Sequence, residues 1–414
     1  MSLNLDASMA EVTRLTRAGR LAEALALLRG LTQKPKSPEA SEGLDRKPMR
    51  TASTESQFID MRPPRSGSGH WTAPGFDAHP GSDDARTEGL PLPEVHKRMR
   101  GFLGHLGRLG SGPGSGGMAG HLTRDLQESL PDGARFEEHT ITNEAGTRMY
   151  KLYIPGRYRG EPLPLVVMLH GCTQSPDDFA AGTQMNKLAE EQGLFVAYPR
   201  QPSSANPSKC WNWFNAGDQL RGKGEPSLIA GITRQVMRDF AVDPTRVYVA
   251  GLSAGGAAAA IMGSAYPDLY AAICVHSGLA CGAAKDMPSA FAAMRQGAPL
   301  PIQGTRRPLP TIVFHGDRDN IVSPVNGDHV IAQSKAAADL ELTISHGQSA
   351  GGLKYTRTVQ ADGSGRPILE QWGLHGAGHA WSGGSPAGSY TEPLGPDASR
   401  EMLRFFLEIS KRSA

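Results

Sequence analysis

The chain has 414 residues, of which 39% are hydrophobic and 20% are charged, and its formal net charge is +2 at pH 7. This length allows one large domain or two small ones, and the near-neutral charge gives no electrostatic basis for binding nucleic acid or a membrane surface. The apolar runs are shorter than a bilayer crossing requires, so we expect no integral membrane segment.

The first part of the chain predicts an extension that precedes the folded domain. Apolar residues recur at spacings of three to six between residues 8 and 31, which indicates a short helical segment within residues 1–31. Residues 32–131 are rich in Pro, Ser, Gly, Arg and Asp, so we expect a low-complexity linker that is largely disordered. The N-terminus lacks a basic region followed by an apolar core, which predicts no secretory signal and favours the cytoplasm.

Over residues 132–414, alternating strand and helix patterns predict one folded domain that is large enough to be an enzyme. A β-hairpin is expected from residues 136–142 and 148–154. Further strands are predicted at residues 164–169, 194–198, 247–250, 271–275, 310–314, 353–359 and 367–374. Helices are predicted at residues 179–192, 225–240, 325–340 and 398–409, with another that starts near residue 255. This alternation predicts an α/β fold with a mostly parallel, doubly wound sheet.

The pentapeptide Gly-Leu-Ser-Ala-Gly at residues 251–255 carries the strongest chemical signal. It lies between a predicted buried strand and a run of small residues, which is a strand–turn–helix context. A sharp turn there exposes the hydroxyl of Ser253, and flanking glycines avoid a clash between a Cβ and the neighbouring backbone. The pattern predicts a nucleophile elbow. The alternative is a glycine-rich turn with an idle serine.

A serine nucleophile needs a base and a carboxylate that orients the base. In this layout the chain order is serine, acid, histidine. We assign Asp319, just past a predicted strand, as the acid; Asp317 is its rival, with holding the turn as its alternative role. We assign His379, in a later glycine-rich loop, as the base, with His375 as its competitor. His276 is predicted to be structural.

An oxyanion hole requires two amide donors near the serine. The layout predicts the amide of Ala254, directly after the nucleophile, and the amide of Cys172, in the loop after the strand at residues 164–169. Cys172 is not expected to be a nucleophile itself, because no dedicated base is visible near it. The other cysteines are Cys210, Cys274 and Cys281; the four lack zinc-ligand spacing, and their pairing stays open among three possibilities.

Three tryptophans are candidates for binding substrate. Trp211 and Trp213 alternate with Asn212 in a segment of loop composition, so they could form a platform for an apolar or ring-bearing substrate. Trp381 lies two residues after His379 and is a similar candidate. The alternative for all three is a place in the core.

Five motifs in order resemble the polyhydroxybutyrate (PHB) depolymerase family of esterases, and feruloyl and acetylxylan esterases are similar. They are Leu-His-Gly-Cys-Thr-Gln at 169–174, Cys-Trp-Asn-Trp-Phe at 210–214, Gly-Leu-Ser-Ala-Gly-Gly at 251–256, His-Gly-Asp-Arg-Asp at 315–319 and Gly-His-Ala-Trp-Ser-Gly-Gly at 378–384. The resemblance implies an α/β-hydrolase fold and ester substrates. It also implies a triad of Ser253, Asp319 and His379, with amides from Cys172 and Ala254. Many members of the family are secreted, which makes extracellular action the alternative to the cytoplasm.

The expected function is therefore a serine esterase that needs no metal or cofactor. Its only expected partner is the ester substrate. This would be either a hydroxyalkanoate ester, as an oligomer or a polyester, or the ester of a short acyl group. The alternatives are a carbohydrate-ester hydrolase of feruloyl or acetylxylan type and a non-catalytic binding module. The oligomeric state stays open.

Overall fold

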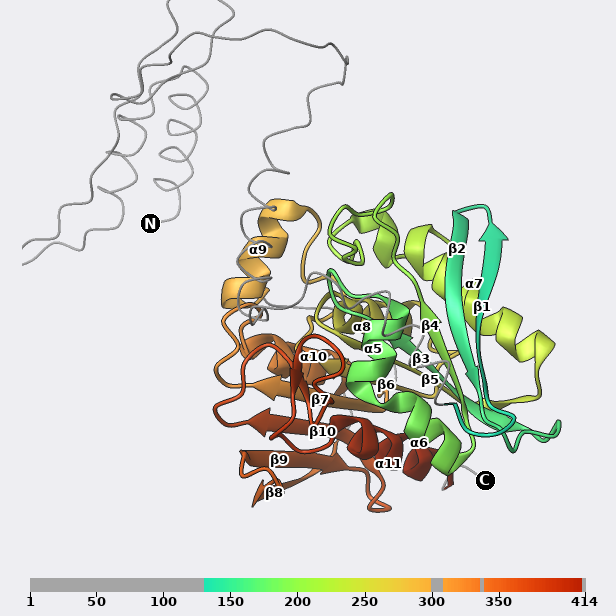
Figure 1. Ribbon diagram of the computed structural model, residues 1–414. Coiled ribbons are helices and arrows are strands. Elements are labelled where there is room, and N and C mark those ends of the chain that lie inside the picture. Colours follow the sequence, from blue (N-terminus) through green and yellow to red (C-terminus); the bar gives the residue numbers. More distant parts are fainter. Residues whose placement is uncertain (1–129, 299–307, 336–338, 412–414) are drawn as a thin grey trace, which may run out of the picture. The chain divides into compact units, whose positions relative to one another are not determined.

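The computed structural model describes residues 130–298, 308–335 and 339–411 (Figure 1). The predictions of a helical segment in residues 1–31 and of a disordered linker in residues 32–131 lie outside the described residues, except for residues 130 and 131 at the end of the linker. Among the described residues, no helix is long and apolar enough to cross a membrane.

One sheet of ten strands organises the described residues. The strands are β1 (Arg135–Asn143), β2 (Gly146–Ile154), β3 (Leu163–Leu169), β4 (Phe195–Pro199), β5 (Val242–Leu252), β6 (Ala272–His276), β7 (Thr311–Gly316), β8 (Glu341–Gln348), β9 (Lys354–Ala361) and β10 (Pro367–Leu374). Their order in space is β1-β2-β4-β3-β5-β6-β7-β10-β9-β8. The strands from β4 to β10 in that order are parallel, and the outer pairs are antiparallel. The predicted parallel, doubly wound sheet and the predicted hairpin are confirmed.

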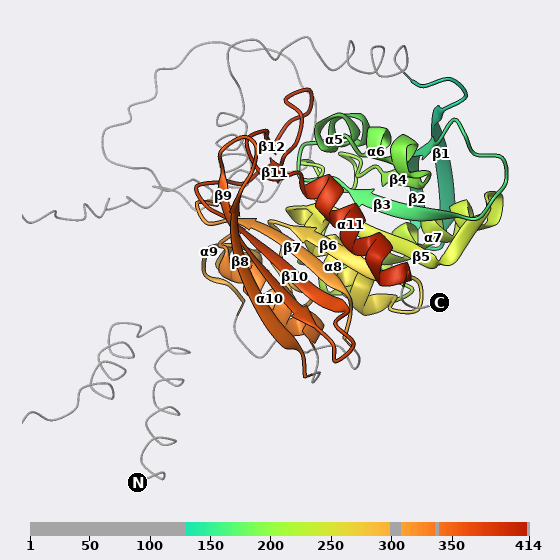
Figure 2. The same ribbon diagram turned by 90° about the horizontal axis from the view of Figure 1, so that it is seen from below.

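Helices cover both faces of this sheet (Figures 1 and 2). They are α5 (Pro176–Thr183), α6 (Met185–Gln192), α7 (Gly224–Asp239), α8 (Ala254–Ala265), α9 (Met287–Gln296), α10 (Val325–Lys335) and α11 (Ala398–Lys411), with a short 3-10 helix η1 (Ala216–Gln219). A two-residue ladder pairs β11 (Trp381–Ser382) with β12 (Thr391–Glu392).

Strand β3 shows how the two faces are built. Leu165, Val167 and Leu169 pack in the cluster that contains the buried side chains of α7, α8, α9 and α10. Val166 and Met168 point to the other face, into the cluster formed with α5, α6 and α11. Because successive side chains of a strand alternate between faces, a run that is apolar throughout belongs between two helical layers.

Two predicted helices differ from the structure, and two elements of the structure were not predicted. The helix expected at residues 179–192 is two helices, because Gln184 has a φ of 55° and ends α5 in the left-handed region. The helix expected at residues 325–340 ends within the described residues at Lys335, and the edge strand β8 begins six residues later. Neither β8 nor α9 was predicted; β8 is almost wholly exposed, and only Leu342 and Ile344 alternate with polar residues along it.

Candidate active site

The turn between β5 and α8 holds Ser253 in a strained conformation. Its φ is 58° and its ψ is −118°, which an L-residue adopts only under constraint from its surroundings. A Cβ on Gly255 would overlap the carbonyl oxygen of Leu169, and a Cβ on Gly251 would overlap that of Gly255. Only glycine allows this close approach of helix to strand. The Ser253 side chain does not cap α8, so the turn presents it without using it in the helix terminus.

Asp319 lies three residues past the end of β7, in a loop that surrounds its carboxylate with donors. Oδ1 accepts the amides of Ile321 and Val322 at 2.9 Å each, and Oδ2 lies 2.7 Å from Nδ1 of His379. The side chain of His315 adds a contact at 3.4 Å. Burial by itself would raise the pKa of Asp319, but its hydrogen bonds and charge interactions with His315 and His379 outweigh burial and hold that pKa well below its ordinary value.

The structure brings the predicted triad residues to one edge of the sheet. Ser253 follows β5, Asp319 follows β7 and His379 follows β10, and these strands are parallel, so their C-terminal ends meet at the same edge. Ser253 and His379 line one cavity together with Cys172 and Ala254. The two residues expected to supply oxyanion amides therefore lie beside the expected nucleophile and base.

The rival residues form a separate pair outside this cavity. Nδ1 of His375 lies 3.1 Å from Oδ2 of Asp317, and both side chains are about half exposed. Oδ1 of Asp317 accepts the amide of Gly376 at 2.7 Å, and the amide of Arg318 donates to Ala377 at 3.0 Å. These contacts join the loop that carries Asp319 to the loop that carries His379. Asp317 therefore has a structural position, in line with the alternative that it holds the turn.

His276, expected to be structural, is fully buried at the end of β6. Its ring stacks between those of Phe314 and Trp381, at 5.6 and 5.0 Å between centroids. Its Nε2 accepts the amide of Ser382 at 3.0 Å. Burial lowers the pKa of His276 to about 3, so the ring is neutral and suited to accepting that bond.

A disulfide joins Cys172 to Cys210 and settles the pairing that the sequence left open. It links the expected oxyanion loop to the loop after β4. Nε1 of Trp211 donates to the carbonyl of His170 at 3.0 Å, and the amide of Gln201 donates to Nε2 of His170 at 3.1 Å. Cys274 and Cys281 are free thiols. The loop that carries the Cys172 amide is thus held by the disulfide and, through His170, by hydrogen bonds to Trp211 and Gln201.

A buried polar network supports this loop, and sequence reasoning missed it. Nη1 of Arg148 donates to Gln201 at 2.6 Å, and Nε2 of Gln201 donates to the carbonyl of Cys210 at 2.9 Å and to Glu225 at 2.5 Å. Glu225 also accepts the amide of Asn212 at 2.8 Å. These residues come from β2, the segment after β4 and α7, so no local pattern distinguished them from ordinary surface residues.

Removing the disulfide should weaken both the fold and the site. The double substitution Cys172→Ser with Cys210→Ser is expected to lower the free energy of unfolding by about 2–4 kcal/mol, because the bond closes a long loop in the unfolded chain. It should also lower kcat by roughly ten- to a hundredfold, the size expected when a catalytic group moves by about 1 Å. Denaturant melts and ester kinetics measure the two effects, with Cys281→Ser as the control. Parent-like values for both would contradict this role.

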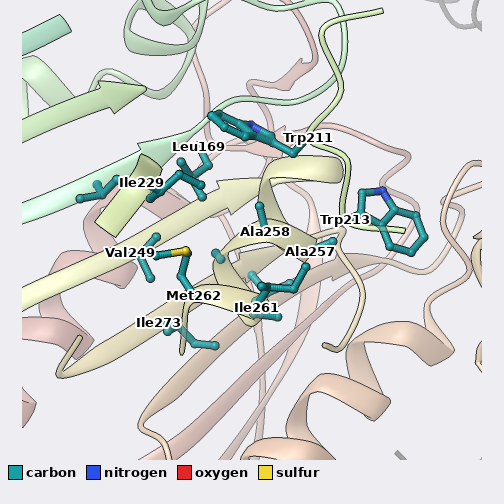
Figure 3. Packing of buried hydrophobic residues seen from close by; sticks show 14 of the residues in the cluster. Leu169, Trp211, Trp213, Ile229, Val249, Ala257, Ala258, Ile261, Met262 and Ile273 are labelled. Atoms are coloured by element: carbon teal, nitrogen blue, oxygen red, sulfur yellow. The ribbon is translucent and has the colours of Figure 1, made fainter. Parts of the chain in front are cut away.

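Two of the three candidate tryptophans belong to the core, which corrects their assignment to substrate binding. Trp211 is 0% exposed and lies beside Leu169 in the cluster shown in Figure 3. Trp381 is 1% exposed, packs edge-on against Phe179 at 5.5 Å and donates to Ser399 at 3.0 Å. Their N–H groups bond to protein atoms and their faces pack against apolar side chains, as buried indoles require.

Trp213 differs from the other two tryptophans. It lies at the edge of the same cluster (Figure 3) and lines the cavity beside Ser253, next to Phe214. The expectation that it contacts substrate stays a prediction.

Much of the remaining cavity wall comes from α9 and from the loop after Asp319. The space inside its walls and mouth is about 770 Å³, including the part open to solvent. The apolar residues contributed by α9 and neighbouring loops are Leu279, Met287, Ala290, Phe291, Met294, Ile321 and Val322. Sequence reasoning missed α9, although its start carries a signal: Asp286 and Ser289 form a capping box and Pro288 lies in the first turn.

Comparison with known proteins agrees with this geometry. Residues 148–343 match the family model described as Esterase PHB depolymerase. Poly(3-hydroxyalkanoate) depolymerase C of Paucimonas lemoignei is 32% identical over 252 residues, which are 58% of this chain and 59% of that protein. Feruloyl esterase B of Thermothelomyces thermophilus is 29% identical over 243 residues, which are 54% of this chain and 80% of that protein. This chain thus spans less than two thirds of the depolymerase's length.

A solved structure supports the fold. The acetyl xylan esterase from Aspergillus awamori superposes with a TM-score of 0.51 at 20% identity, covering 66% of this chain and 99% of that one. The sheet order, the elbow after β5 and the matched family model point the same way. The domain described here has the α/β-hydrolase fold, and its residues 148–343 match the PHB depolymerase family of esterases.

Proposed function

We propose that this chain is a carboxylic ester hydrolase that uses Ser253, Asp319 and His379 as a catalytic triad. One observation carries the proposal: Ser253, His379, Cys172 and Ala254 line a single cavity, while Asp319 holds Nδ1 of His379 at 2.7 Å. This is the set of groups that acyl transfer through a serine requires.

The chemistry follows from the place of each group. The Ser253 hydroxyl attacks the ester carbonyl while Nε2 of His379 takes its proton, and Asp319 accepts the Nδ1 proton and stabilises the imidazolium that forms. The amides of Cys172 and Ala254 stabilise the oxyanion of the tetrahedral intermediate. His379 then protonates the leaving alcohol, and water releases the acyl group from Ser253 by the same steps in reverse.

The relatives' names suggest two classes of ester. The depolymerase points to hydroxyalkanoate esters, and feruloyl esterase B points to carbohydrate esters as the second candidate. A non-catalytic binding module is disfavoured, because such a module would have no need for a strained serine, a buried Asp–His pair and two amides around one cavity.

Covalent labelling tests the proposal. A fluorophosphonate probe reacts with a serine only when a base and an oxyanion hole activate it. We expect stoichiometric labelling of the intact chain, with the probe mapped by mass spectrometry to the peptide that contains Ser253. Ser253→Ala should abolish labelling, and the exposed-loop control Ser364→Ala should not change it. An unlabelled parent protein, or a label on another residue, would overturn the assignment.

A further inference from the structure

One face of α9 forms an apolar wall of the cavity. Met287, Phe291 and Met294 are separated by four and three residues, so they project from the same side of the helix, and all three line the cavity that contains Ser253. Leu279 and Ile321 extend this surface from adjoining loops. We call these five residues the α9 wall.

The α9 wall is held against the loop that carries the triad acid. The amide of Ser323, in the segment after Asp319, donates to the carbonyl of Met294 at 2.7 Å. Nδ2 of Asn326 donates to the carbonyl of Ala293 at 2.9 Å. These bonds use the backbone of α9, so its cavity-facing side chains can be changed without removing them. The wall is therefore preformed, which lowers the cost of ordering it around a ligand.

Polar side chains are few on the cavity surface that the described residues form. They are those of Ser253, His379, Tyr390 and Trp213, and no Asp, Glu, Lys, Arg, Asn or Gln is among the described lining residues. The Tyr390 hydroxyl already shares a hydrogen bond with Thr173 at 3.1 Å. A substrate hydroxyl pressed against the α9 wall would lose hydrogen bonds to water without replacing them.

We propose that the α9 wall binds the acyl chain of the substrate and that this chain is apolar and longer than acetyl. The inference rests on the proposed function. The acyl group stays bonded to Ser253 through both half-reactions, with its oxygen at the amides of Cys172 and Ala254, so it occupies the cavity that all three residues line. The leaving alcohol departs after the first half-reaction. Aliphatic or phenyl-terminated acyl esters thus fit better than acetyl esters or esters with a free hydroxyl on the acyl chain. A hydroxyalkanoate would fit as an internal unit, whose hydroxyl is itself esterified.

The test is a series of p-nitrophenyl esters with acetyl, butyryl, hexanoyl and 3-hydroxybutyryl groups, hydrolysed by the full chain. Burying one methylene favours binding by about fourfold, so kcat/KM should rise by up to about fifteenfold for each two-carbon step. The 3-hydroxybutyryl ester should be slower than the butyryl ester. Phe291→Ala should lower kcat/KM on hexanoate by about tenfold while changing acetate by less than about twofold.

Two alanines of α9, separated by Phe291, provide a matched pair. Ala290 lines the cavity and is 3% exposed, whereas Ala292 is exposed on the outer side of the helix. Ala290→Leu should shift the preference towards shorter acyl chains, and Ala292→Leu should leave the series unchanged. Melting temperatures identify any variant that fails to fold. If Ala290→Leu fails to fold, Phe291→Ala still tests whether the α9 wall binds the acyl chain.

The failures of the two proposals are distinguishable. A flat acyl series in a protein whose Ser253 still reacts with the fluorophosphonate overturns the acyl-wall inference alone. A steep dependence on the alcohol in a series of acetate esters, with no dependence on the acyl chain, overturns it too. A protein that cleaves no ester and leaves Ser253 unlabelled overturns the proposed function, and the inference with it.

Discussion

Replacing Ser253 by alanine is expected to lower kcat/KM for p-nitrophenyl butyrate by more than about a thousandfold, because loss of a triad nucleophile normally costs at least that much. The fold should persist. The side chain does not cap α8, and the strained turn is held by the backbone and by the close approach of Gly251 and Gly255. We expect the free energy of unfolding to change by less than about 1 kcal/mol.

The kinetic and stability measurements must be made on the same preparation. Ser364→Ala, in an exposed loop between β9 and β10, should match the parent in both. Residual activity above about a thousandth of the parent, in a folded Ser253→Ala protein, would reject Ser253 as the nucleophile.

Replacing Asp319 by asparagine is expected to lower kcat by about a thousand- to ten-thousandfold, with a smaller change in KM. The carboxylate accepts from Nδ1 of His379 at 2.7 Å and so leaves Nε2 free to take the serine proton. An amide can present an N–H to Nδ1 instead, which would favour the wrong tautomer and would not stabilise the imidazolium.

Asp317→Asn is the matched control for that substitution. Asp317 carries the same change two residues away, but it is about half exposed and bonds to His375 outside the cavity. We expect its kcat to stay within about threefold of the parent, as for other weak surface ion pairs. Equal losses in the two variants, or a larger loss in Asp317→Asn, would transfer the acid role away from Asp319.

Acid stability provides a second measurement for Asp319. Its pKa is lowered in the folded protein from an ordinary value of 3.8, so the folded state favours the ionised form. The resulting stabilisation is present in full above the unfolded pKa and is lost as the pH falls through the lowered folded pKa. Asp319→Asn should therefore unfold with a weaker dependence on pH below about pH 4 than the parent does.

The sequence was sufficient for nine of the ten strands of the sheet and for the chain order of the expected triad. The apolar run of β3 and the hairpin around residues 143–146 are local patterns, and each implies its partners through the alternation of side chains and the geometry of a tight turn. The elbow could also be predicted from the sequence. A Cβ at residue 251 or 255 would overlap the backbone of the neighbouring helix or strand, so both positions require glycine.

Only the tertiary structure decided which candidate residues face the cavity. Trp211 and Trp213 have the same local setting, yet Trp211 donates to the carbonyl of His170 in the core while Trp213 lines the cavity. The partner of Cys172 was likewise open among three cysteines until the loop after β4 placed Cys210 against it.

The reason lies in sequence separation. Trp381 is buried by Phe179 on α5 and by His276 at the end of β6. The α9 wall reaches Ser253 only because β5, β6 and β7 lie side by side in the sheet. A local pattern reports whether a side chain is apolar and which periodicity it follows. Whether that side chain meets protein or an open cavity depends on elements distant in the chain, and the packing of the sheet and its helices decides it.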